Sequence, residues 1–581
     1  MLPTTRWKFP DIDSKKQHIL EKELGVKPVI SRILINRHIE DPDDAKRFLH
    51  PSLEDLHNPF LMKDVDRGVD RVIKAISTGE RIVIYGDYDA DGITSVVVLV
   101  KFLKSIHENI TSYIPDRIKE GYGLNRDAID RIKKDKVTLI ITVDCGITDY
   151  EEVSYANSIG IDTIILDHHE VPEILPKAVA AINPHRTDCS FPFKHLAGVG
   201  IAFNFLIALR GKLRQSGFWN DKTYPNLKEY LDLVALGTIG DISPLIDENR
   251  IFARIGLDII NEGKRVGIRA LREKSGLSLN NMDSTDASFK IIPRINAAGR
   301  VGSPEDAVKL LLTEDINEAR GIAAMLDGYN RERQEIERSI FNEILQLIED
   351  KSSSDKINSI VLASPEWHPG VIGIVASKLV DRYYRPTILI SLKDGVGKGS
   401  GRSIAEFNLY DGLKNKCDSL LISYGGHRYA AGISIEEKNI EKLSHALDEA
   451  ILEDLDVSEL APSTCIDAEC NLREIDRDLI SQIEMLAPFG NMNPEPVLCV
   501  KNIQVKSLTT VGNNHLRMRL NKNNINHDSI WFSKGHFSDL LTESRVNIAF
   551  TPHINNWNGM SNIQLKMKDV SIAERQIETF A

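Results

Sequence analysis

The chain has 581 residues, of which 42% are hydrophobic and 27% charged, and this composition is typical of a soluble globular protein. One hydrophobic core rarely serves so many residues, so about three domains are expected. The formal net charge of −12 argues against a uniformly basic nucleic-acid-binding surface, although an acidic protein can still hold a local basic groove.

The amino-terminal segment and the cysteines predict a cytoplasmic protein. Residues 1–17 contain no apolar segment of the kind found in secretory signals, and no apolar run in the chain is long enough to cross a bilayer. The six cysteines are scattered and include no Cys-x-x-Cys pair, which favours reduced thiols over a disulfide framework or a zinc site.

The first half of the chain alternates short apolar runs with longer helical stretches, the pattern of a mostly parallel sheet. Strands are predicted at 81–85, 137–143 and 163–166. A helix is expected directly after the first strand, and further helices are expected at 196–213, 227–240 and 250–262. Between residues 303 and 350 the pattern becomes helical and highly charged, which predicts a long connecting helix.

The polar segment KSSSDK at 351–356 marks a predicted domain boundary. A second α/β unit follows, with strands in SIVLAS and PTILISL, a helix between them, a glycine-rich turn at GVGKGSGRS and two more helices. After about Pro462 the segments become short and alternating, which predicts a small β-barrel or sandwich.

Acidic residues and a histidine pair directly follow the three predicted strands of the first half. In chain order they are Asp87, Asp89, Asp91, Asp144, Asp167, His168 and His169. Ligands of an open parallel sheet bind beyond the carboxyl ends of its strands, so these side chains should converge at one edge. Carboxylates at alternate positions can reach two cations at once, as two-metal phosphoryl chemistry requires. The imidazoles shift the preference from magnesium toward manganese.

Each of these elements has a simpler explanation when it is taken alone. DxDxDG resembles a calcium loop, but it lacks the downstream glutamate and follows a strand. A single aspartate at a strand end is most often a helix N-cap. The combination on consecutive strands favours a metal site. Asp241 interrupts an apolar helical run and is a further candidate, with helix termination near Ser243 and Pro244 as an equally good explanation.

A set of ordered motifs between residues 50 and 435 resembles the DHH phosphoesterase family, in its branch of single-strand-specific exonucleases. The amino-terminal motifs are YGDYDADGITS, IPDRIKEGYGL, VDCGI, DHH at 167–169, NP at 183–184, LAGVGIAF, LVALGTIGDISPL and PRINAAGR. The motifs SPEWHPGVIGIVASKL, GKGSGRS and GGHRYAAG resemble the DHH-associated domain.

The resemblance implies an α/β fold in which a parallel-sheet DHH domain is joined by a long helix to a smaller α/β DHH-associated domain, followed by a β domain similar to an OB-fold. The expected parts are an N-terminal helical segment at 1–50, the DHH domain at 51–312, connecting helices at 313–355, the DHH-associated domain at 356–458 and the OB-fold-like domain at 459–581.

The resemblance also implies stepwise hydrolysis of single-stranded DNA from its 5′ end, with release of nucleoside monophosphates in DNA repair and recombination. Two divalent cations, Mn²⁺ or Mg²⁺, are the implied cofactors. A RecQ-type helicase and a single-strand-binding protein are the implied protein partners. We expect a monomer that does not associate with membranes.

The motif positions imply roles for individual residues. The implied metal ligands are Asp89, Asp91, Asp144, His168 and Asp241, with Asp144 bridging the ions. His169 would face the scissile phosphate, Asp167 would orient the histidines, and Asp87 would support the ions or bind them directly. Arg117 and Arg300 would neutralise substrate phosphates, and Ser400 with Arg402 would hold the 5′ end. Asn296 and His427 are further implied substrate-binding residues, the latter from the second lobe.

Two positions depart from the family pattern. Tyr85 stands where many DHH proteins have a histidine, four residues before Asp89, so one cation either has a poorer ligand set or is compensated by Asp87. The segment KIIP before Arg294 lacks an expected glycine, which could alter a turn near the DNA path.

Two other functions fit the same motifs. A DHH phosphatase acting on short oligonucleotides, cyclic dinucleotides or pyrophosphate would share the acids, but the extra C-terminal region favours a long polymer. A non-enzymatic DNA-binding relative would have lost some acids, which are all present here. The C-terminal residues Arg517, Arg519, Lys522, Trp531 and Phe532 are compatible with single-strand binding, although any half-exposed sheet gives a similar pattern.

Overall fold

The computed structural model describes residues 6–219, 224–278, 281–351, 358–455, 462–542, 544–557 and 560–573. Its contacts divide the chain into two compact units. One unit contains the described parts of 57–243 and 255–460, and the other those of 1–56, 244–254 and 461–581. The predicted boundary at KSSSDK, from residue 352 on, and the predicted boundary at 458–459 lie outside the described residues.

The first unit begins with a five-stranded parallel sheet in the order β3-β2-β4-β5-β6. Its strands are β2 (Arg81–Gly86), β3 (Ile110–Tyr113), β4 (Val137–Val143), β5 (Asp162–Leu166) and β6 (Ala180–Ile182). The three strands expected from the apolar runs are confirmed to within one residue at each end. These runs are almost continuously apolar because helices cover both faces of the sheet.

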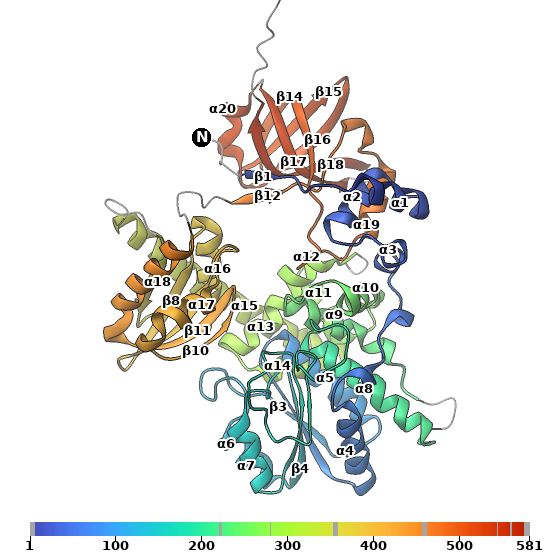
Figure 1. Ribbon diagram of the computed structural model, residues 1–581, viewed down its shortest axis with the longest axis vertical. Coiled ribbons are helices and arrows are strands. Elements are labelled where there is room, and N and C mark those ends of the chain that lie inside the picture. The colour runs from blue at the N-terminus through green and yellow to red at the C-terminus, as the bar shows by residue number, and fades with distance from the viewer. Residues whose placement is uncertain are drawn as a thin grey trace, which may run out of the picture. The chain divides into compact units, whose positions relative to one another are not determined.

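Alternate side chains of the sheet pack against different helices, as the two-residue period of a strand requires. The helices around it are α4 (Val65–Thr78), α5 (Ala90–Lys104), α6 (Arg126–Lys134), α7 (Tyr150–Ser158) and α8 (Gly198–Gln215). Val83, Tyr85 and Ile140 share a core with α6 and α7. Figure 1 shows α6 and α7 on one side of the sheet and α4 and α8 on the other.

A helical region follows the sheet. Its elements are α9 (Leu231–Gly240), α10 (Asp247–Glu262), α11 (Val266–Lys274), α12 (Ser284–Asp286), the π-helix η4 (Ala287–Ile291), α13 (Ile292–Val301), α14 (Pro304–Leu312) and α15 (Ile316–Lys351). The expected long connecting helix is confirmed as α15, which has 36 residues. The segment KIIP, which lacks the expected glycine, lies at the junction of η4 and α13.

A second sheet in the same unit has the order β10-β11-β9-β8-β7. Its strands are β7 (Ile360–Ser364), β8 (Thr387–Lys393), β9 (Val396–Arg402), β10 (Leu421–His427) and β11 (Ala430–Glu436). Only β7 and β8 pair in parallel. The helices beside it are α16 (Ile372–Tyr383), α17 (Leu409–Gly412) and α18 (Ile440–Asp454).

The prediction of a glycine-rich turn at GVGKGSGRS is wrong, because this segment forms β9 in the middle of the sheet. Gly397, Gly399 and Gly401 alternate and therefore share one face. A Cβ atom at these positions would lie 2.5 to 2.7 Å from Ile390, Ile433 and Leu409 respectively, so the glycines leave room for neighbouring side chains. GGHRYAAG, in turn, supplies the β10–β11 hairpin, which was not predicted as strands.

The other unit is built on a closed β-barrel. Its strands are β14 (Leu498–Val511), β15 (His515–Lys522), β16 (Ile525–Trp531), β17 (Arg545–Trp557) and β18 (Met560–Ile572), and pairing of β14 with β17 closes the sheet. This confirms the predicted small β-barrel. The amino-terminal helices α1 (Ser14–Leu24), α2 (Pro28–Asn36) and α3 (Pro42–Leu49) pack into the same hydrophobic core, together with α19 (Arg477–Met485).

Strand pairing also links the beginning of the chain to the part of this unit that follows residue 461. β1 (Arg6–Lys8) pairs in parallel with β12 (Ser463–Cys465), and the two-residue β13 (Ala468–Glu469) extends β14. The buried guanidinium of Arg250 donates hydrogen bonds to four backbone carbonyl oxygens, those of Phe48, Met485, Leu486 and Ala487. In the part of the chain that the structure describes, no helix could span a membrane.

Candidate metal centre and substrate-binding residues

The loop after β2 places three aspartates at the start of α5. Asp89 caps this helix, because its carboxylate accepts hydrogen bonds from the backbone N–H groups of Asp91 and Gly92, at 2.9 and 3.2 Å. The turn is so tight that a Cβ atom at Gly92 would lie 2.5 Å from the carbonyl oxygen of Asp87. Asp91 reaches the amino-terminal end of α8 and accepts hydrogen bonds from the N–H groups of Gly198 and Val199.

The next two strands deliver the remaining acids at their carboxyl ends. Asp144 directly follows β4 with a φ of 59°, and its N–H group donates to the carbonyl of Leu166. Asp167 follows β5, and one of its oxygens accepts hydrogen bonds from the His169 ring at 2.8 Å and from the N–H groups of His168 and His169. This carboxylate therefore orients the histidine pair.

Asp241 directly follows α9, so the explanation as a helix end applies. Its carboxylate nevertheless faces the same cluster, because it lies 3.8 Å from His168 Nδ1 and accepts a hydrogen bond from the hydroxyl of Ser243. Asp241 therefore both ends the helix and stands at a position where it can bind a metal ion.

The structure brings all of the predicted ligands together at one edge of the sheet. Ligand atoms within 4.8 Å of one another form three groups, which are Asp91–His168–Asp241, Asp87–Asp89–Asp144 and Asp144–His168–His169. Asp144 and His168 each belong to two groups, and Asp144 Oδ1 lies 3.0 Å from His168 Nε2. This overlap is what a pair of cations sharing a bridging carboxylate would need.

The acids repel one another in a buried environment, and this changes their protonation. Burial and the charge of Asp241 raise the pKa of Asp91 to about 7. Burial and the neighbouring carboxylates also raise the pKa values of Asp87 and Asp144 well above the usual range. Burial likewise raises the pKa of Asp241. Without added positive charge, the cluster therefore retains protons.

Unlike the acids of the cluster, Asp167 and His169 stabilise each other's charged forms. Burial alone would raise the pKa of Asp167, but the hydrogen bond and charge of His169 lower it to about 2. Burial alone would lower the pKa of His169, but the same contact raises it to about 9. Asp167 and His169 thus form an ion pair near neutral pH, and His169 can present a positive charge to an anionic group.

The donor set fits divalent cations. Asp87 Oδ1 is buried and has no hydrogen-bond partner in the described part of the chain. A buried polar atom without a partner is costly, so this oxygen points to a ligand. A site with several carboxylates and one or two imidazoles suits manganese or magnesium better than a soft metal.

Tyr85 does not contribute to these groups. Its hydroxyl donates to the carbonyl of Gly123 at 2.8 Å, and its ring stacks on Tyr113 within the core under α6 and α7. Asp87, by contrast, is one of the grouped carboxylates. Of the two possibilities considered from the sequence, a poorer ligand set for one cation or compensation by Asp87, the geometry favours compensation by Asp87.

Two residues that support the cluster were not predicted. The Tyr122 hydroxyl lies 3.0 Å from the carbonyl oxygen of Asp144, to which it donates, and 3.1 Å from His169 Nδ1. The Asn183 amide donates to the carbonyl oxygen of His169 at 2.9 Å. Both stand in quoted motifs, EGYGL and NP, but an ordinary tyrosine or asparagine gives no local signal of such a contact.

Three predicted phosphate-binding arginines form a second cluster close to the acids. Burial and the charges of other arginines, Arg117 foremost, lower the pKa of Arg300 to about 10, whereas Asp89 acts in the opposite direction. Burial and Arg117 also lower the pKa of Arg402. All three arginines are half-buried, and half-buried arginines that repel one another are typical of a site for anions.

Helix α13 and the elements around the second sheet meet at the arginine cluster. Arg300 of α13 donates to the carbonyl oxygen of Gly370 at 2.9 Å, just before α16. A Cβ atom at Gly373 in the first turn of α16 would lie 2.7 Å from Ser400 Oγ, so the helix start approaches Ser400 closely. No side chain caps this end of α16, whose N–H groups favour an anion.

The other predicted substrate residues are placed as follows. His427, at the end of β10, lies 3.8 Å from Glu170, the residue after His169. Asn296 accepts a hydrogen bond from the N–H group of Ala90 at 2.7 Å and so ties α13 to the acidic loop. A cavity of about 170 Å³ beside the arginines is lined by Arg117, Arg300 and His368 among others.

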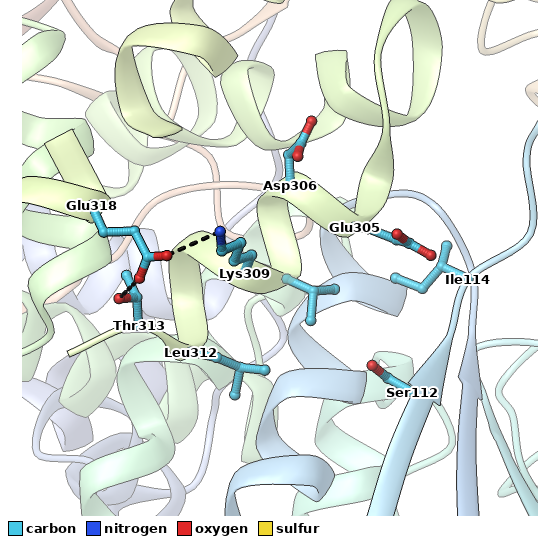
Figure 2. A pocket seen from close by; sticks show the side chains of 9 residues that line it. Ser112, Ile114, Glu305, Asp306, Lys309, Leu312, Thr313 and Glu318 are labelled. Carbon is cyan, nitrogen blue, oxygen red and sulfur yellow. Dashed lines mark hydrogen bonds and ion pairs between the residues drawn. The ribbon is translucent and has the colours of Figure 1, made fainter. Parts of the chain in front are cut away.

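A larger cavity lies away from the predicted site residues. It has a volume of about 540 Å³ and lies between β3 and α14. Figure 2 shows its lining, with Glu305 beside Ile114 and above Ser112 toward one end, and Glu318 bound to Lys309 toward the other. Size alone therefore does not locate the candidate site in this protein.

The C-terminal residues named from the sequence have mixed positions. Trp531 is buried in the barrel core, whereas Phe532 is 48% exposed and packs edge-on against His515. Arg517 is paired with Asp528, and Lys522 donates to the carbonyl of Lys501. Only Phe532 of the two aromatics can offer a stacking surface.

Comparison with known proteins agrees with the motif order. Residues 81–238 match the N-terminal domain of the DHH family, residues 356–453 the DHHA1 domain and residues 466–569 the RecJ OB domain. A single-stranded-DNA-specific exonuclease RecJ of Bacillus subtilis is 37% identical over 98% of this chain and 71% of its own length. The chain belongs to the RecJ family.

Other members agree with this assignment. The RecJ exonuclease of Escherichia coli is 37% identical over 84% of this chain and 86% of its own length. A crystal structure of RecJ from Thermus thermophilus in complex with Mn²⁺ superposes with a TM-score of 0.83 at 28% identity, covering 98% of this chain and 80% of that one. The DHH, DHHA1 and OB parts expected for the family are therefore all present here.

Proposed function

We propose that this protein is a metal-dependent exonuclease that hydrolyses single-stranded DNA from its 5′ end to nucleoside 5′-monophosphates. The observation that carries this proposal is that a largely buried carboxylate–histidine cluster lies beside a half-buried arginine cluster within one unit of the chain. The first cluster suits cations and the second suits phosphates. A phosphodiester is a substrate that needs both.

The predicted ligands Asp89, Asp91, Asp144, His168 and Asp241 would hold two divalent ions, Mn²⁺ or Mg²⁺, with Asp87 completing the set. Bound there, such ions supply charge neutralisation and an activated water for in-line attack on phosphorus. Asp144 would bridge the two positions because it belongs to two ligand groups.

The remaining residues would bind and orient the DNA. His169, held by Asp167 with a raised pKa, would donate to a non-bridging oxygen of the scissile phosphate. Arg117, Asn296 and Arg300 would contact the substrate beside the acids. Ser400, Arg402 and the start of α16 would hold the terminal 5′ phosphate, and His427 would contact the strand from the β10–β11 hairpin.

The cell biology of the family extends the proposal. We place the protein in DNA repair and recombination in the cytoplasm, and its six cysteines are all unpaired, as a reducing compartment favours. We also propose that it acts as a monomer with a RecQ-type helicase and a single-strand-binding protein, which would supply and protect the single-stranded substrate.

The test uses single-stranded oligonucleotides labelled at the 5′ or 3′ end, with Mn²⁺. Early release of labelled mononucleotide from the 5′-labelled strand, with gradual shortening of the 3′-labelled one, is expected. Asp144→Asn should bind the strand without cleaving it. Absence of mononucleotide release by the wild type would refute the proposal. Faster turnover of dinucleotides than of long strands would favour the short-oligonucleotide phosphodiesterase instead.

A further inference from the structure

Arg117 is bound differently from the other two arginines of its cluster. Arg300 and Arg402 each donate to a backbone carbonyl oxygen. In the part of the chain that the structure describes, Arg117 has no hydrogen bond or ion pair, and its guanidinium lies over the ring of Tyr88, with Cζ 4.8 Å from the ring centroid. Among the described residues, therefore, nothing occupies the five N–H donors of Arg117.

The acid next to Arg117 in the chain binds its own loop. The Asp116 carboxylate accepts hydrogen bonds from the backbone N–H groups of Ile118 and Lys119, both at 3.0 Å, and pairs with the Lys119 ammonium at 3.1 Å. A carboxylate partner would cancel much of the charge that a phosphate needs. An aromatic ring attracts the cation through its quadrupole and leaves the N–H donors unused. The contact with Tyr88 thus suits an arginine that must bind an anion.

Tyr88 belongs to the loop that carries the clustered acids. It stands between two of them and is half-buried. A Cβ atom at Gly299 would lie 2.3 Å from the carbonyl oxygen of Tyr88 and 3.0 Å from its Cβ atom, so α13 packs directly against this residue. The next residue of α13 is Arg300. Tyr88 is therefore fixed where the acidic loop, α13 and Arg117 meet.

Arg117 needs an attractive partner because the other arginines repel it. Burial and the charge of Arg117 lower the pKa values of both Arg300 and Arg402, so the repulsion acts within the cluster. A long side chain with many rotamers can move away from such repulsion. A cation–π contact favours the placed over the displaced guanidinium by about 2- to 30-fold, from exposed to desolvated settings.

We propose that Tyr88 is a positioning residue whose ring holds the Arg117 guanidinium beside the acidic cluster, with its N–H donors open to one phosphate of single-stranded DNA. This inference rests on the proposed function and deepens it. The loop that carries the metal ligand Asp89 then also fixes the position of that phosphate relative to the metal site. The Tyr88 hydroxyl has no part in this role, because it makes no hydrogen bond with any described residue.

The test is a double-mutant cycle on the affinity for a fluorescent single-stranded oligonucleotide, measured by anisotropy in EDTA, where metal-dependent cleavage is absent. Tyr88→Leu removes the ring and should weaken binding about 2- to 30-fold. In the Arg117→Met background the same substitution should have almost no effect, because the guanidinium that Tyr88 positions is gone. Equal factors in the two backgrounds would overturn the proposal, since Tyr88 would then act independently of Arg117.

A second series keeps the shape of the ring and changes its charge distribution. Tyr88→Phe retains the ring and should retain the coupling to Arg117. Phenylalanines with one, two and three ring fluorines at the Tyr88 position should weaken binding in steps, because each fluorine withdraws negative charge from the ring face. A ring that only fills space would give no trend, so a flat series refutes the proposal. The series also decides the question if Tyr88→Leu does not fold.

The contact that is lost should be a contact with one phosphate. Neutral methylphosphonate linkages replace the phosphates of the oligonucleotide one at a time. At one linkage the loss of affinity seen with wild type should disappear in Arg117→Met and shrink in Tyr88→Leu. The slope of log affinity against log salt should fall by about 0.7 in Arg117→Met, as loss of one single-strand phosphate contact predicts. Absence of any linkage to which both variants respond would contradict the assignment.

Tyr155→Leu is the matched control. The Tyr155 ring lies under Arg126 in the same way, with 5.5 Å from Cζ to the ring centroid, and the helices α6 and α7 that carry the pair hold none of the predicted site residues. The substitution should lower only the melting temperature and leave the salt slope unchanged. Coupling of Tyr88 to Arg117 in a protein that releases no mononucleotides would support the positioning role and refute the proposed hydrolysis. Additive effects in an active enzyme would do the reverse.

Discussion

Gly237→Ala is expected to disturb the metal centre although no ligand is changed. The added methyl carbon would lie 2.3 Å from Thr94 Oγ1, and ordinary van der Waals contact begins near 3.4 Å, so α9 and α5 must separate by about 1 Å. The same carbon would lie 2.8 Å from Val199 and 3.0 Å from Asp91 Oδ1. Overpacking of this kind costs about 1–3 kcal/mol of stability.

The separation should reach the predicted ligand Asp241, because its N–H group donates to the carbonyl of Gly237 at 2.8 Å, one helical turn earlier. A displacement of about 1 Å in a catalytic constellation can lower the rate on the order of 100-fold. We therefore expect weaker Mn²⁺ binding by calorimetry, slower strand hydrolysis and a lower melting temperature without metal.

Gly211→Ala is the matched control within α8. A Cβ atom at Gly211 has nothing within 4 Å, so the substitution only improves helix propensity. It should raise stability by about 0.5–1 kcal/mol and leave Mn²⁺ affinity unchanged. Wild-type stability and activity in Gly237→Ala would refute the close packing of α5, α8 and α9 around the cluster.

Three further predictions concern the acids and their supports. Because the pKa of Asp91 is raised to about 7 and those of Asp87 and Asp144 are raised as well, bound Mn²⁺ must displace at least one proton below pH 7. The Kd of Mn²⁺ should therefore rise at least about tenfold per pH unit from 7 to 5.5 in calorimetry, and a flat profile contradicts this. Tyr122→Phe removes the hydroxyl at His169 and should lower kcat about fivefold at unchanged KM, as loss of one hydrogen bond predicts; an unchanged kcat means that the contact is dispensable. Arg186→Met leaves the Asp64 carboxylate buried without its main partner and should cost about 3 kcal/mol in urea unfolding. Burial by itself would raise the pKa of Asp64, but the contact with Arg186 lowers it. The stability that this pair contributes is therefore present above pH about 3.9 and is lost as the pH falls further. Equal urea midpoints for the variant and the wild type at pH 7 would contradict the pairing.

The acidic cluster could be predicted from the sequence because it depends on local and periodic features. A strand between two helical layers needs an unbroken apolar run, and the carboxyl ends of parallel strands meet at one edge. The positions of Asp89, Asp144 and Asp167 after such runs were sufficient to place them together. The arginines could be named from motif order, but no local pattern distinguishes a phosphate ligand from a surface ion pair.

Glycines were the main source of error. In β9 the alternation of glycine with polar residues predicts a turn, because both glycine and a lack of apolar side chains favour loops. Only the neighbouring strands show why Gly399 has no side chain, since Ile433 already fills that space. Ile242 is the opposite case, because its positive φ of 60° favours glycine and the chain has an isoleucine at this position.

The sequence by itself determined the α/β class, the long helix α15, the C-terminal barrel and the order of the acids, because each depends on residues that are near one another in the chain. Tertiary structure decided what depends on distant residues. It placed the amino-terminal helices in the core of the C-terminal barrel, turned Tyr85 away from the acids and brought Tyr122 to His169. Such contacts arise from packing of whole layers, and no period or spacing in the chain encodes them locally.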